Sequence, residues 1–376
     1  MRILEVASHS SVRRGGAIQL LRLARELRRR GHDVHCVFNR PEGKQVRDSL
    51  EDLRYFEQEV CPVTTLPLTG AASFAARMAF RRLVRQGGFE VIHAHRDEAL
   101  LFAWTSAFFA RRFPPIVAQR GNSYPLKRLR PIRAAFRSPR VARVVAVADA
   151  VRDVLVQCGI PASKIDVVYG GVDLERFHPG IDGASLRREL GIRDDSVVFG
   201  NVASIGPRKG HAEFFQAAAR VRARRPNAVF LLAGDGNFRK YRPLLDSLGL
   251  TDSVVYAGFR RDVERVFAAA DVVVCSPNKG EGLSGVIREA LAMEKPVVST
   301  DVAGNREFVR DGETGRLVPP VDPDSLARAM LDLAGDPQRA RQYARRGREA
   351  ILDLIDNRRR CDRIERIYHS VAGDSH

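Results

Sequence analysis

Two short apolar runs near the end of the chain place the strongest constraint on its fold. Val272 to Cys275 forms the first run, and Val297 with Val298 forms the second. Short continuous runs of this kind are typical of strands buried on both faces of a parallel sheet. A glycine-containing loop and a helical pattern separate them, so we expect a strand, loop, helix, strand unit.

The same alternation opens the chain. A short apolar strand over Ile3 to Ala7 precedes a helical pattern that begins near Leu20, and another strand follows at Val34 to Phe38. This is the beginning of a Rossmann-type domain. A chain of 376 residues is too long for one core. We therefore predict an α/β protein with two doubly wound domains, residues 1–178 and 179–355, and a last helix over 356–376.

The sequence argues against several classes of protein. No apolar run approaches the roughly 18 residues of a membrane span, and Glu5 inside the first apolar segment indicates a strand and not a signal peptide. The five cysteines show neither metal-ligand nor redox spacing, which indicates a reducing cytosol and no metal site. The first loop lacks the Gly-x-Gly-x-x-Gly fingerprint, so we expect no nicotinamide or flavin cofactor.

The net charge of +17 is concentrated in the first half of the chain. Residues 1–180 hold 30 Lys and Arg against 17 Asp and Glu, and the rest holds 32 against 28. Between Leu101 and Ala148 there are ten basic residues and no acidic one. Such a segment attracts an anionic membrane, nucleic acid or a phosphorylated acceptor, although an Arg-rich composition can also reflect coding bias. The charge keeps a nucleic-acid-binding protein as an alternative, although the sequence contains no recognisable nucleic-acid-binding motif.

Two acids follow the first apolar run, with seven residues between them. Glu281 lies at the end of the loop and Glu289 about two turns into the expected helix. Gly282, Ser284 and Gly285 fall at the first turn of that helix, where free N–H groups and the helix dipole favour a phosphate. The arrangement suits a small anionic ligand with hydroxyl groups. Two ordinary glutamates on a surface helix are the alternative.

The wider stretch resembles one family. Glu281-Gly282, the Glu-Ala-Leu-Ala segment and Lys295 to Thr300 together resemble the retaining glycosyltransferases of family 4, which have the GT-B fold of two Rossmann-like domains facing across a cleft. The resemblance implies sugar transfer from a nucleotide-diphosphate sugar, without a metal or cofactor, and a last helix that returns to the first domain. A UDP-sugar is favoured, and GDP-mannose or another donor on a soluble acceptor is the alternative. Glu281 would contact the donor sugar and Glu289 the ribose.

The resemblance also assigns other donor residues. Lys209 occupies the place of a lysine that grips the donor diphosphate, while the family's arginine is replaced by Ser204, so Arg208 could supply the missing charge. His95 would approach the donor sugar. Catalysis would rest on stabilising the leaving phosphate through Lys209 and the amides of residues 282–285. The remaining donor positions are Gly15, Gly16, Gly234, Gly236, Phe259, Arg260 and Leu283.

Family members place the acceptor on the first domain, where this chain carries its excess charge. We therefore expect an anionic or lipid-linked glycan acceptor, such as lipopolysaccharide core or an exopolysaccharide precursor, and a cytoplasmic protein peripheral to the membrane. The loop at Arg120 matches the family only at Gly121. A helix over Arg130 to Arg137, with Phe136, is the expected contact. The cations assigned to the acceptor or membrane are Arg120, Arg128, Arg130, Arg133 and Arg137.

Overall fold

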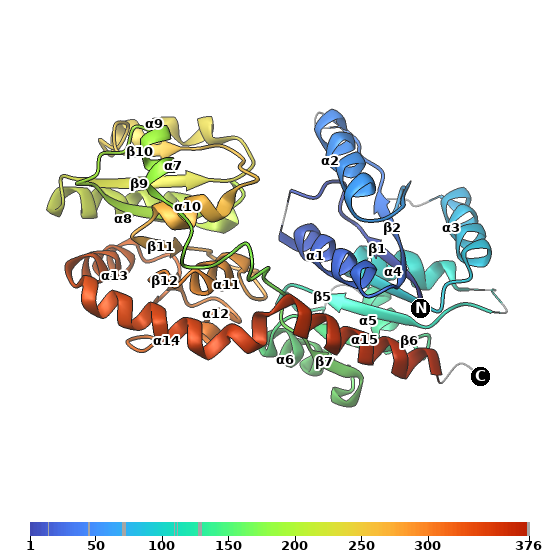
Figure 1. Ribbon diagram of the computed structural model, residues 1–376. Helices are drawn as coiled ribbons and strands as arrows, with labels where there is room; N and C mark the ends of the chain where they lie inside the picture. The colour runs from blue at the N-terminus through green and yellow to red at the C-terminus, as the bar shows by residue number, and fades with distance from the viewer. Residues whose placement is uncertain are drawn as a thin grey trace. The chain divides into compact units, whose positions relative to one another are not determined.

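The computed structural model describes residues 1–13, 15–43, 46–69, 73–108, 110, 112–126 and 130–373, without the side chain of residue 130. The chain forms two compact units, Met1–Gly171 with Asp356–His376, and Val172–Ile355 (Figure 1). The predicted boundary was after residue 178, whereas residues 172–178 lie with the second unit.

The first unit is built on a seven-stranded parallel sheet with the order β3-β2-β1-β4-β5-β6-β7. Its strands are β1 (Arg2–Ala7), β2 (Asp33–Asn39), β3 (Val63–Leu66), β4 (Val91–His95), β5 (Ile116–Arg120), β6 (Val141–Ala146) and β7 (Ile165–Val167). The chain runs from β1 outward to β3 and then returns to β4 on the other side of β1. The carboxyl ends of β1 and β4 therefore form the switch point of this sheet.

The helices of the first unit cover both faces of this sheet. They are α1 (Gly15–Arg29), α2 (Val46–Glu59), α3 (Phe74–Gly87), α4 (Asp97–Ser106), α5 (Arg130–Arg137), α6 (Asp149–Gln157), α15 (Asn357–Gly373) and the short 3₁₀ helix η1 (Ala162–Lys164). Helices α1, α2 and α15 share one core with the strands. Because crossovers between parallel strands are right-handed, the helices that follow β3, β4 and β5 lie on the other face. Helix α4 packs between α3 and α5.

Helix α15 brings the last part of the chain back to the first unit. Cys361, Ile364 and Tyr368 are fully buried in the same core as Leu23 and Leu27 of α1. The helix also contacts β4 and β6. Residues more than 300 positions apart therefore pack directly against one another (Figure 1).

The second unit contains a six-stranded parallel sheet with the order β10-β9-β8-β11-β12-β13. Its strands are β8 (Val197–Val202), β9 (Ala228–Ala233), β10 (Val254–Tyr256), β11 (Val272–Cys275), β12 (Val297–Thr300) and β13 (Arg316–Val318). The two apolar runs of the sequence are β11 and β12, which are adjacent and almost completely buried. The prediction of two doubly wound α/β halves is confirmed.

Helices cover both faces of the second sheet as well. They are α7 (Ala184–Glu189), α8 (His211–Arg224), α9 (Arg242–Ser247), α10 (Val263–Ala269), α11 (Gly285–Ala292), α12 (Asn305–Phe308), α13 (Pro323–Gly335) and α14 (Pro337–Ile355), with 3₁₀ turns η2 (Pro207–Lys209) and η3 (Phe238–Tyr241). Helices α8 and α13 contribute to one core, and α7 and α10 to another. Within the described part of the chain, no helix has the length and apolarity needed to span a bilayer.

Candidate active site

The second sheet has its switch point between β8 and β11. Strand β8 is followed by β9 on one side, whereas β11 pairs with β8 on the other. All strands of this sheet are parallel, so the loops after β8 and β11 leave neighbouring strands at the same carboxyl edge. Open α/β sheets bind ligands at this place. The predicted donor residues Lys209 and Glu281 lie on these two loops.

Hydrogen bonds join the two loops closely. The Asn278 N–H donates to the Arg208 carbonyl at 3.0 Å, and the Ser276 hydroxyl donates to the Lys209 carbonyl at 3.2 Å. Gly210 has a φ of 66°, and a Cβ at this position would lie 1.8 Å from the Ser276 carbonyl oxygen. Only glycine tolerates both this conformation and this approach. The loop around Lys209 is thus held in one position against the loop that leads to Glu281.

The side chains of Lys209 and Glu281 form an ion pair. Their exposed fractions are 30% and 20%, so the pair is sheltered but reachable from solvent. The ammonium group predicted to hold a diphosphate and the carboxylate predicted to hold a sugar therefore meet at one point. An anion that binds Lys209 competes with Glu281 for the same positive charge.

Helix α11 begins later than the sequence analysis expected. Its first residue is Gly285, so Gly282 and the buried Leu283 and Ser284 precede the helix. The Ser284 N–H already donates to Asn305 Oδ1 at 3.2 Å, which corrects the expectation that this amide is free. The Ser284 side chain makes no capping hydrogen bond to the first turn of α11. The amides that begin at Gly285 are thus the ones placed to meet an anion.

Glu289 lies in the middle of α11 and is half-buried. It is separated from Glu281 by the loop end and about one helical turn. The buried Asn305 braces this region, because its side-chain nitrogen donates to Ser299 Oγ at 3.2 Å and to the Thr300 carbonyl at 3.1 Å. Strand β12 thereby fixes the beginning of α11.

Gly234 and Gly236 bring the loops after β8 and β9 together. A Cβ on Gly234 would lie 1.8 Å from the Ala203 carbonyl oxygen, and one on Gly236 would lie 2.9 Å from atoms of Ile205. The Gly234 N–H donates to the Gly258 carbonyl at 2.8 Å, which joins the loop after β10 to the same edge. Close packing of three loops accounts for both glycines.

The loop after β10 carries Phe259 and Arg260. Phe259 is 36% exposed. Arg260 donates to Asp262 at 2.8 and 2.9 Å and to Glu189 at 2.7 Å, and these acceptors raise its pKa above the ordinary value. The structure therefore places Arg260 in an ion-pair network of its own unit.

Ser204 occupies the position where the family has an arginine, and Arg208 follows four residues later. Ser204 is half-buried and supplies no charge. Arg208 is exposed, and its guanidinium makes no ion pair with any described residue, whereas its carbonyl accepts from Asn278. Lys209 is consequently the cation that the fold fixes beside Glu281.

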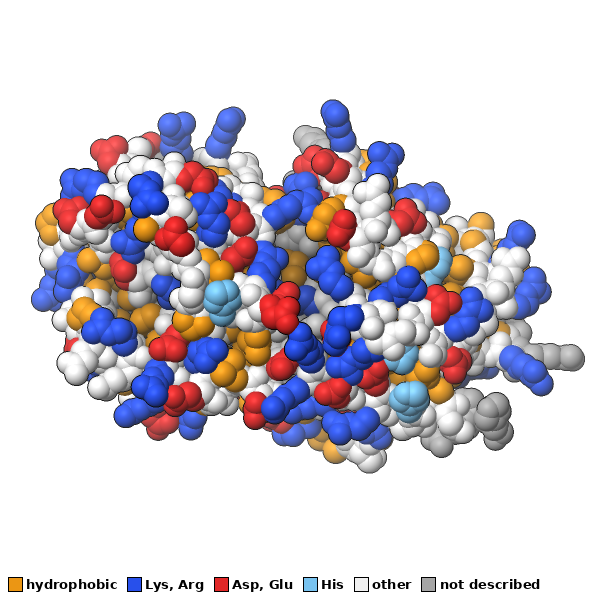
Figure 2. Space-filling model, viewed as in Figure 1, with side chains coloured by type: hydrophobic (Ala, Val, Ile, Leu, Met, Phe, Trp, Pro, Cys, Tyr) orange, Lys and Arg blue, Asp and Glu red, His pale blue; other side chains and the backbone are white. Residues whose placement is uncertain are grey.

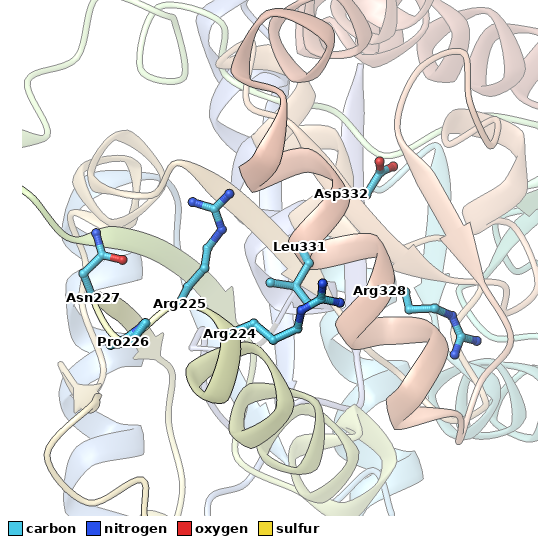
Figure 3. Close-up of a pocket in the computed structure, with 7 residues that line it drawn as sticks. All are labelled: Arg224, Arg225, Pro226, Asn227, Arg328, Leu331 and Asp332. Atoms are coloured by element: carbon cyan, nitrogen blue, oxygen red, sulfur yellow. The ribbon is translucent and has the colours of Figure 1, made fainter.

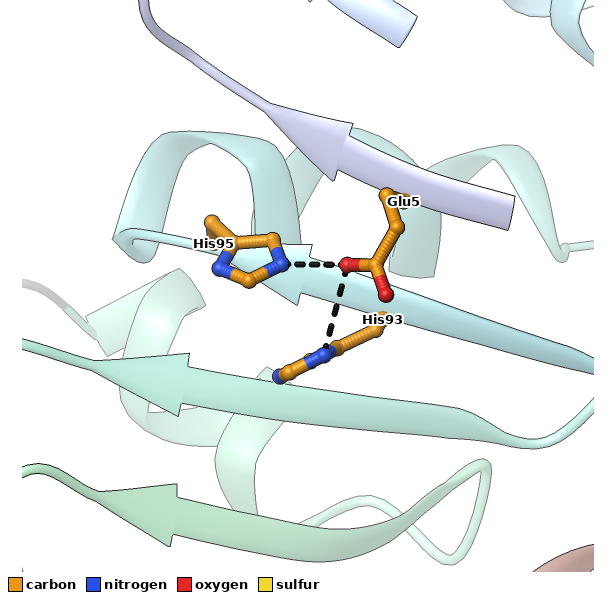
Figure 4. A group of neighbouring side chains, drawn as sticks. All are labelled: Glu5, His93 and His95. Atoms are coloured by element: carbon orange, nitrogen blue, oxygen red, sulfur yellow. Dashed lines mark hydrogen bonds and ion pairs between the residues drawn. The ribbon is translucent and has the colours of Figure 1, made fainter. Parts of the chain in front are cut away.

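In the first unit, His95 ends β4 at the switch point and is 2% exposed. Its Nε2 lies 2.5 Å from Glu5 Oε2, and His93 Nδ1 lies 3.4 Å from the same oxygen. Glu5 reaches from β1 and both histidines from β4 (Figure 4). Tyr368 of α15 completes the cluster with hydrogen bonds to His93 at 2.6 Å and Glu5 at 2.8 Å. His95 Nδ1 is buried without a hydrogen-bond partner among the described residues.

Burial and neighbouring charges set the protonation of this cluster. Burial alone raises the pKa of Glu5, but the two histidines lower that pKa to well below its usual value. Burial and the nearby His93 lower the pKa of His95 from 6.5 to about 4. Burial and Glu5 raise the pKa of Tyr368. Near neutral pH the cluster thus pairs an ionised Glu5 with a neutral His95.

Glu5, His93 and His95 are also residue types that bind metal ions. Their ligand atoms lie within 4.8 Å of one another. The local sequence does not reveal this group, because His93 and His95 lie 88 and 90 positions from Glu5. Hydrogen bonds to Glu5 and Tyr368 already engage Nε2 of His95 and Nδ1 of His93, and they account for this geometry.

Gly15 and Gly16 form the first residues of α1, and both are exposed. A Cβ on Gly15 would meet nothing within 4 Å, whereas one on Gly16 would lie 2.8 Å from His9 Nε2. The close approach of the first loop to the helix beginning therefore depends on Gly16.

Arg120 ends β5 and is 1% exposed. Its guanidinium donates to the Asn122 carbonyl at 3.2 Å and to the Tyr124 carbonyl, and lies 3.7 Å from Asp97. Burial lowers the pKa of Arg120, and Asp97 partly offsets this effect. The structure places Arg120 as an internal brace for the loop that follows β5.

The helix expected to contact the acceptor is α5. Arg133 and Arg137 are exposed on it, but Phe136 is fully buried, so the expectation that Phe136 faces a partner is wrong. Arg128 and the side chain of Arg130 lie outside the described residues. Helix α5 can therefore present charge but no aromatic ring.

A pocket of about 550 Å³ lies elsewhere in the second unit (Figure 3). It is formed where α8 ends, at the turn into β9, and along α13. Its lining residues are Arg224, Arg225, Pro226, Asn227, Arg328, Leu331 and Asp332. Because Asn227 directly precedes β9, the pocket is at the amino edge of the sheet, away from Lys209 and Glu281.

Sequence reasoning missed Glu5, Tyr368 and Asn305. Glu5 was noticed only as an acid in an apolar strand, which is itself a signal, because a buried carboxylate needs partners. Tyr368 gave no local signal, since its partners lie more than 270 positions away. Asn305 follows β12, and its contact with the Ser284 N–H depends on tertiary packing.

Curated proteins that this chain matches include two glycosyltransferases. EpsD, a putative glycosyltransferase of Bacillus subtilis, is 32% identical over 53% of this chain and 53% of its own length. An Escherichia coli UDP-Gal:alpha-D-GlcNAc-diphosphoundecaprenol alpha-1,3-galactosyltransferase is 24% identical over 76% of this chain and 77% of its own. The chain spans about half the length of several curated relatives that it matches.

The whole chain is also similar to solved structures. Anabaena HepE, crystallised in complex with UDP, gives a TM-score of 0.84 at 23% identity, over 98% of this chain and 100% of that one. Residues 13–176 match the model of glycosyltransferase family 4, and residues 195–336 match that of glycosyl transferases group 1. The predicted fold class is confirmed, and the chain belongs to the family 4 glycosyltransferases of the GT-B fold.

Proposed function

We propose that this glycosyltransferase moves a sugar, with retention at the anomeric carbon, from a UDP-sugar to an anionic or lipid-linked glycan. The observation that carries the proposal is the ion pair of Lys209 and Glu281 on the two loops at the switch point of the second sheet. It joins a fixed cation, suited to a diphosphate, with a carboxylate suited to sugar hydroxyls.

In the proposed reaction, the bond between the anomeric carbon and the diphosphate oxygen breaks. The acceptor oxygen forms its bond on the same face of the sugar, and its proton passes to the leaving diphosphate. Lys209 and the amides that begin at Gly285 stabilise the negative charge that grows on that phosphate. Glu281 positions the sugar, and Glu289 holds the ribose. These groups supply the charge in place of a metal ion, so the reaction needs none.

UDP is the preferred donor nucleotide in this proposal. The Escherichia coli relative that aligns with 76% of this chain has UDP-Gal in its name, together with an acceptor on diphosphoundecaprenol. The net charge of +17 favours such an anionic acceptor. In this proposal the acceptor binds to the first unit. The protein acts at the cytoplasmic surface of the membrane.

A nucleotide screen tests the donor. UDP, GDP and ADP are compared by thermal shift, because a ligand at 100 times its dissociation constant stabilises the folded state by about 2.7 kcal/mol. UDP should raise the unfolding temperature most. Duplex DNA at ~150 mM salt should produce little shift, since charge-driven DNA binding weakens steeply with salt. A shift with DNA alone would favour a nucleic-acid-binding protein instead.

The reaction itself is tested by NMR of the product made from the preferred UDP-sugar. Retention predicts the same anomeric configuration in donor and product. Activity should persist after treatment with EDTA. An inverted product, or activity that EDTA abolishes and a divalent ion restores, would contradict the corresponding part of the proposal.

A further inference from the structure

The outward face of α3 exposes two large apolar side chains in the first unit. Phe74 is 77% exposed, more than any other large apolar side chain in the described ranges, and Met78 is 45% exposed. They are four residues apart and therefore lie on one side of the helix. Single exposed apolar residues are ordinary, but neighbouring ones indicate a contact surface.

The fold does not need this apolar face. Helix α3 already buries Ala76, Phe80 and Val84 on its inner side. Phe80 packs edge to face against Phe102 of α4, with ring centroids 5.3 Å apart. The side of α3 that carries Phe74 is therefore a second apolar face on a helix that is already anchored.

The end of α4 adds an aromatic ring nearby. Arg77 of α3 donates to Thr105 Oγ1 at 3.2 Å, and Arg81 donates to the Ser106 carbonyl at 2.5 Å. Just beyond these contacts, Phe108 is 39% exposed and packs against Trp104 with centroids 4.7 Å apart. The two helices are thus joined where their apolar side chains reach the surface.

Cations accompany these apolar groups. Arg82 and Arg85 of α3 and Arg112 after α4 are exposed, and none forms an ion pair with a described residue. We call Phe74, Met78, Arg82, Arg85, Phe108 and Arg112 the α3–α4 surface. In Figure 2, basic and apolar side chains adjoin where Figure 1 shows α3.

This surface carries an excess of positive charge because the two segments that form it contain no acidic residues. Residues 60–89, which include α3, contain four arginines and no Asp or Glu. Residues 101–148 contain ten basic residues and no acidic one. The fold packs α3 against α4 and so places the two acid-free segments side by side. Elsewhere, exposed arginines such as Arg29 and Arg152 pair with acids on their own helices.

We propose that the α3–α4 surface docks on an anionic lipid bilayer. Phe74, Met78 and Phe108 enter the boundary between head groups and acyl chains, and the three arginines face lipid phosphates. Exposed apolar groups beside unpaired cations have the chemistry that this boundary requires. Helix α5 offers charge alone, because Ile132, Ala135 and Phe136 are buried. The inference rests on the proposed membrane-linked acceptor but needs no activity for its test.

The test is co-sedimentation with vesicles of phosphatidylcholine alone or with phosphatidylglycerol, at ~50 and ~300 mM salt. The apolar variant carries Phe74→Ser and Met78→Ser, and the charge variant carries Arg82→Ser and Arg85→Ser. The matched control carries Arg133→Ser and Arg137→Ser on α5. We expect the apolar variant to lose binding to anionic vesicles by roughly tenfold at both salts, and the charge variant mainly at low salt. The control should stay within about threefold.

The single tryptophan gives an independent readout. Trp104 packs against Phe108, so vesicles of brominated lipid should quench its emission in the wild type and the control but not in the apolar variant. Turnover of the UDP-sugar with a water-soluble acceptor should be equal in the wild type, the apolar variant and the charge variant, which also shows that these three proteins are folded. Circular dichroism checks the fold of the α5 control. Failure of glycosyl transfer would leave the vesicle result unchanged.

Four results would overturn the proposal. The wild type could ignore anionic vesicles at ~50 mM salt, or the apolar variant could bind as well as the wild type. The α5 control could lose as much binding as the charge variant, which would place the contact on α5. A wild-type dimer that Phe74→Ser dissociates would show that a second copy of the chain covers this face.

Discussion

The hydroxyl of Tyr368 donates a hydrogen bond to Glu5 across 2.8 Å, although the two residues are 363 positions apart. Both side chains are fully buried. The other carboxylate oxygen of Glu5 meets His95 at 2.5 Å. A buried carboxylate is tolerated only when its oxygens are paired, so the last helix completes an environment that begins at the fifth residue.

We predict that Tyr368→Phe lowers the free energy of unfolding by about 2 kcal/mol. The change removes a hydrogen bond to a buried charged group without creating a large cavity. Urea unfolding at pH 7 measures it. Ser370→Ala on the exposed side of α15 is the control and should change stability by less than about 0.5 kcal/mol. Equal stability of wild type and Tyr368→Phe would show that Glu5 does not depend on this hydroxyl.

A second prediction concerns acid. Because the pKa of folded His95 is lowered to about 4, the unfolded chain takes up this proton first, and stability falls as pH drops from 6.5 toward 4. The lowered pKa of Glu5 adds a further loss below pH 4.5. The His95 contribution is about 3 kcal/mol at most. Urea unfolding of His95→Gln should therefore give a flatter pH profile between 6.5 and 4, and an unchanged slope would contradict the assignment.

Much of the second unit could be predicted from the sequence because its signals are local. The valine runs of β11 and β12 predict buried strands directly. The order of the strands along the chain then places the loops of Lys209 and Glu281 at one edge of the sheet. The direct ion pair between these two residues could not be predicted. It depends on Gly210, whose missing Cβ lets the two loops touch.

The first unit was harder to predict for physical reasons. Arg120 looked like a free cation, since the sequence does not show that Asn122 and Tyr124 fold back to accept its hydrogen bonds. Phe136 looked available, but its amphipathic helix turns it inward. In both cases the residue type was evident, but its exposure depended on tertiary packing.

Gly210→Ala should disrupt the donor site. The new methyl group would lie 1.8 Å from a backbone oxygen and would require a φ of 66°, so we expect a loss of at least ~2 kcal/mol and a large loss of turnover. Gly206→Ala, four residues earlier, is the matched control, because its φ is −169° and nothing lies within 4 Å of its Cβ position. Thermal unfolding and UDP-sugar turnover check both. Similar damage from both changes would mean that the loop tolerates no side chain at all.

Lys209→Ala should lower turnover by at least ~100-fold, since a preorganised charge at a developing anion commonly contributes that much. Stability should change by less than about 1 kcal/mol, because the ion pair with Glu281 is partly exposed. Arg208→Ala, next to it, removes an exposed cation and should stay within a few-fold of wild type. Steady-state turnover distinguishes them. If Arg208→Ala is the more damaged variant, Arg208 supplies the charge missing at Ser204.

The last prediction separates the two acids. Glu289→Ala should weaken UDP binding by ~10-fold or more, because a contact to the ribose exists before the reaction begins. Glu281→Ala should mainly lower turnover, because contacts to the sugar position the reacting centre. Isothermal titration with UDP and steady-state kinetics measure the two effects.

The ion pair sharpens this contrast. In the free protein, the Glu281 carboxylate is paired with the Lys209 ammonium group, which a diphosphate would need. Removing its carboxylate leaves Lys209 without a competitor, so UDP should bind to Glu281→Ala as tightly as to wild type, or more tightly, even though sugar transfer is slow. Glu281→Gln keeps the hydrogen-bonding shape without the charge, and it should show the same gain in UDP affinity with a smaller loss of turnover. An equal loss of UDP affinity in the Glu281 and Glu289 variants would contradict the separate roles, because it would mean that both acids hold the nucleotide.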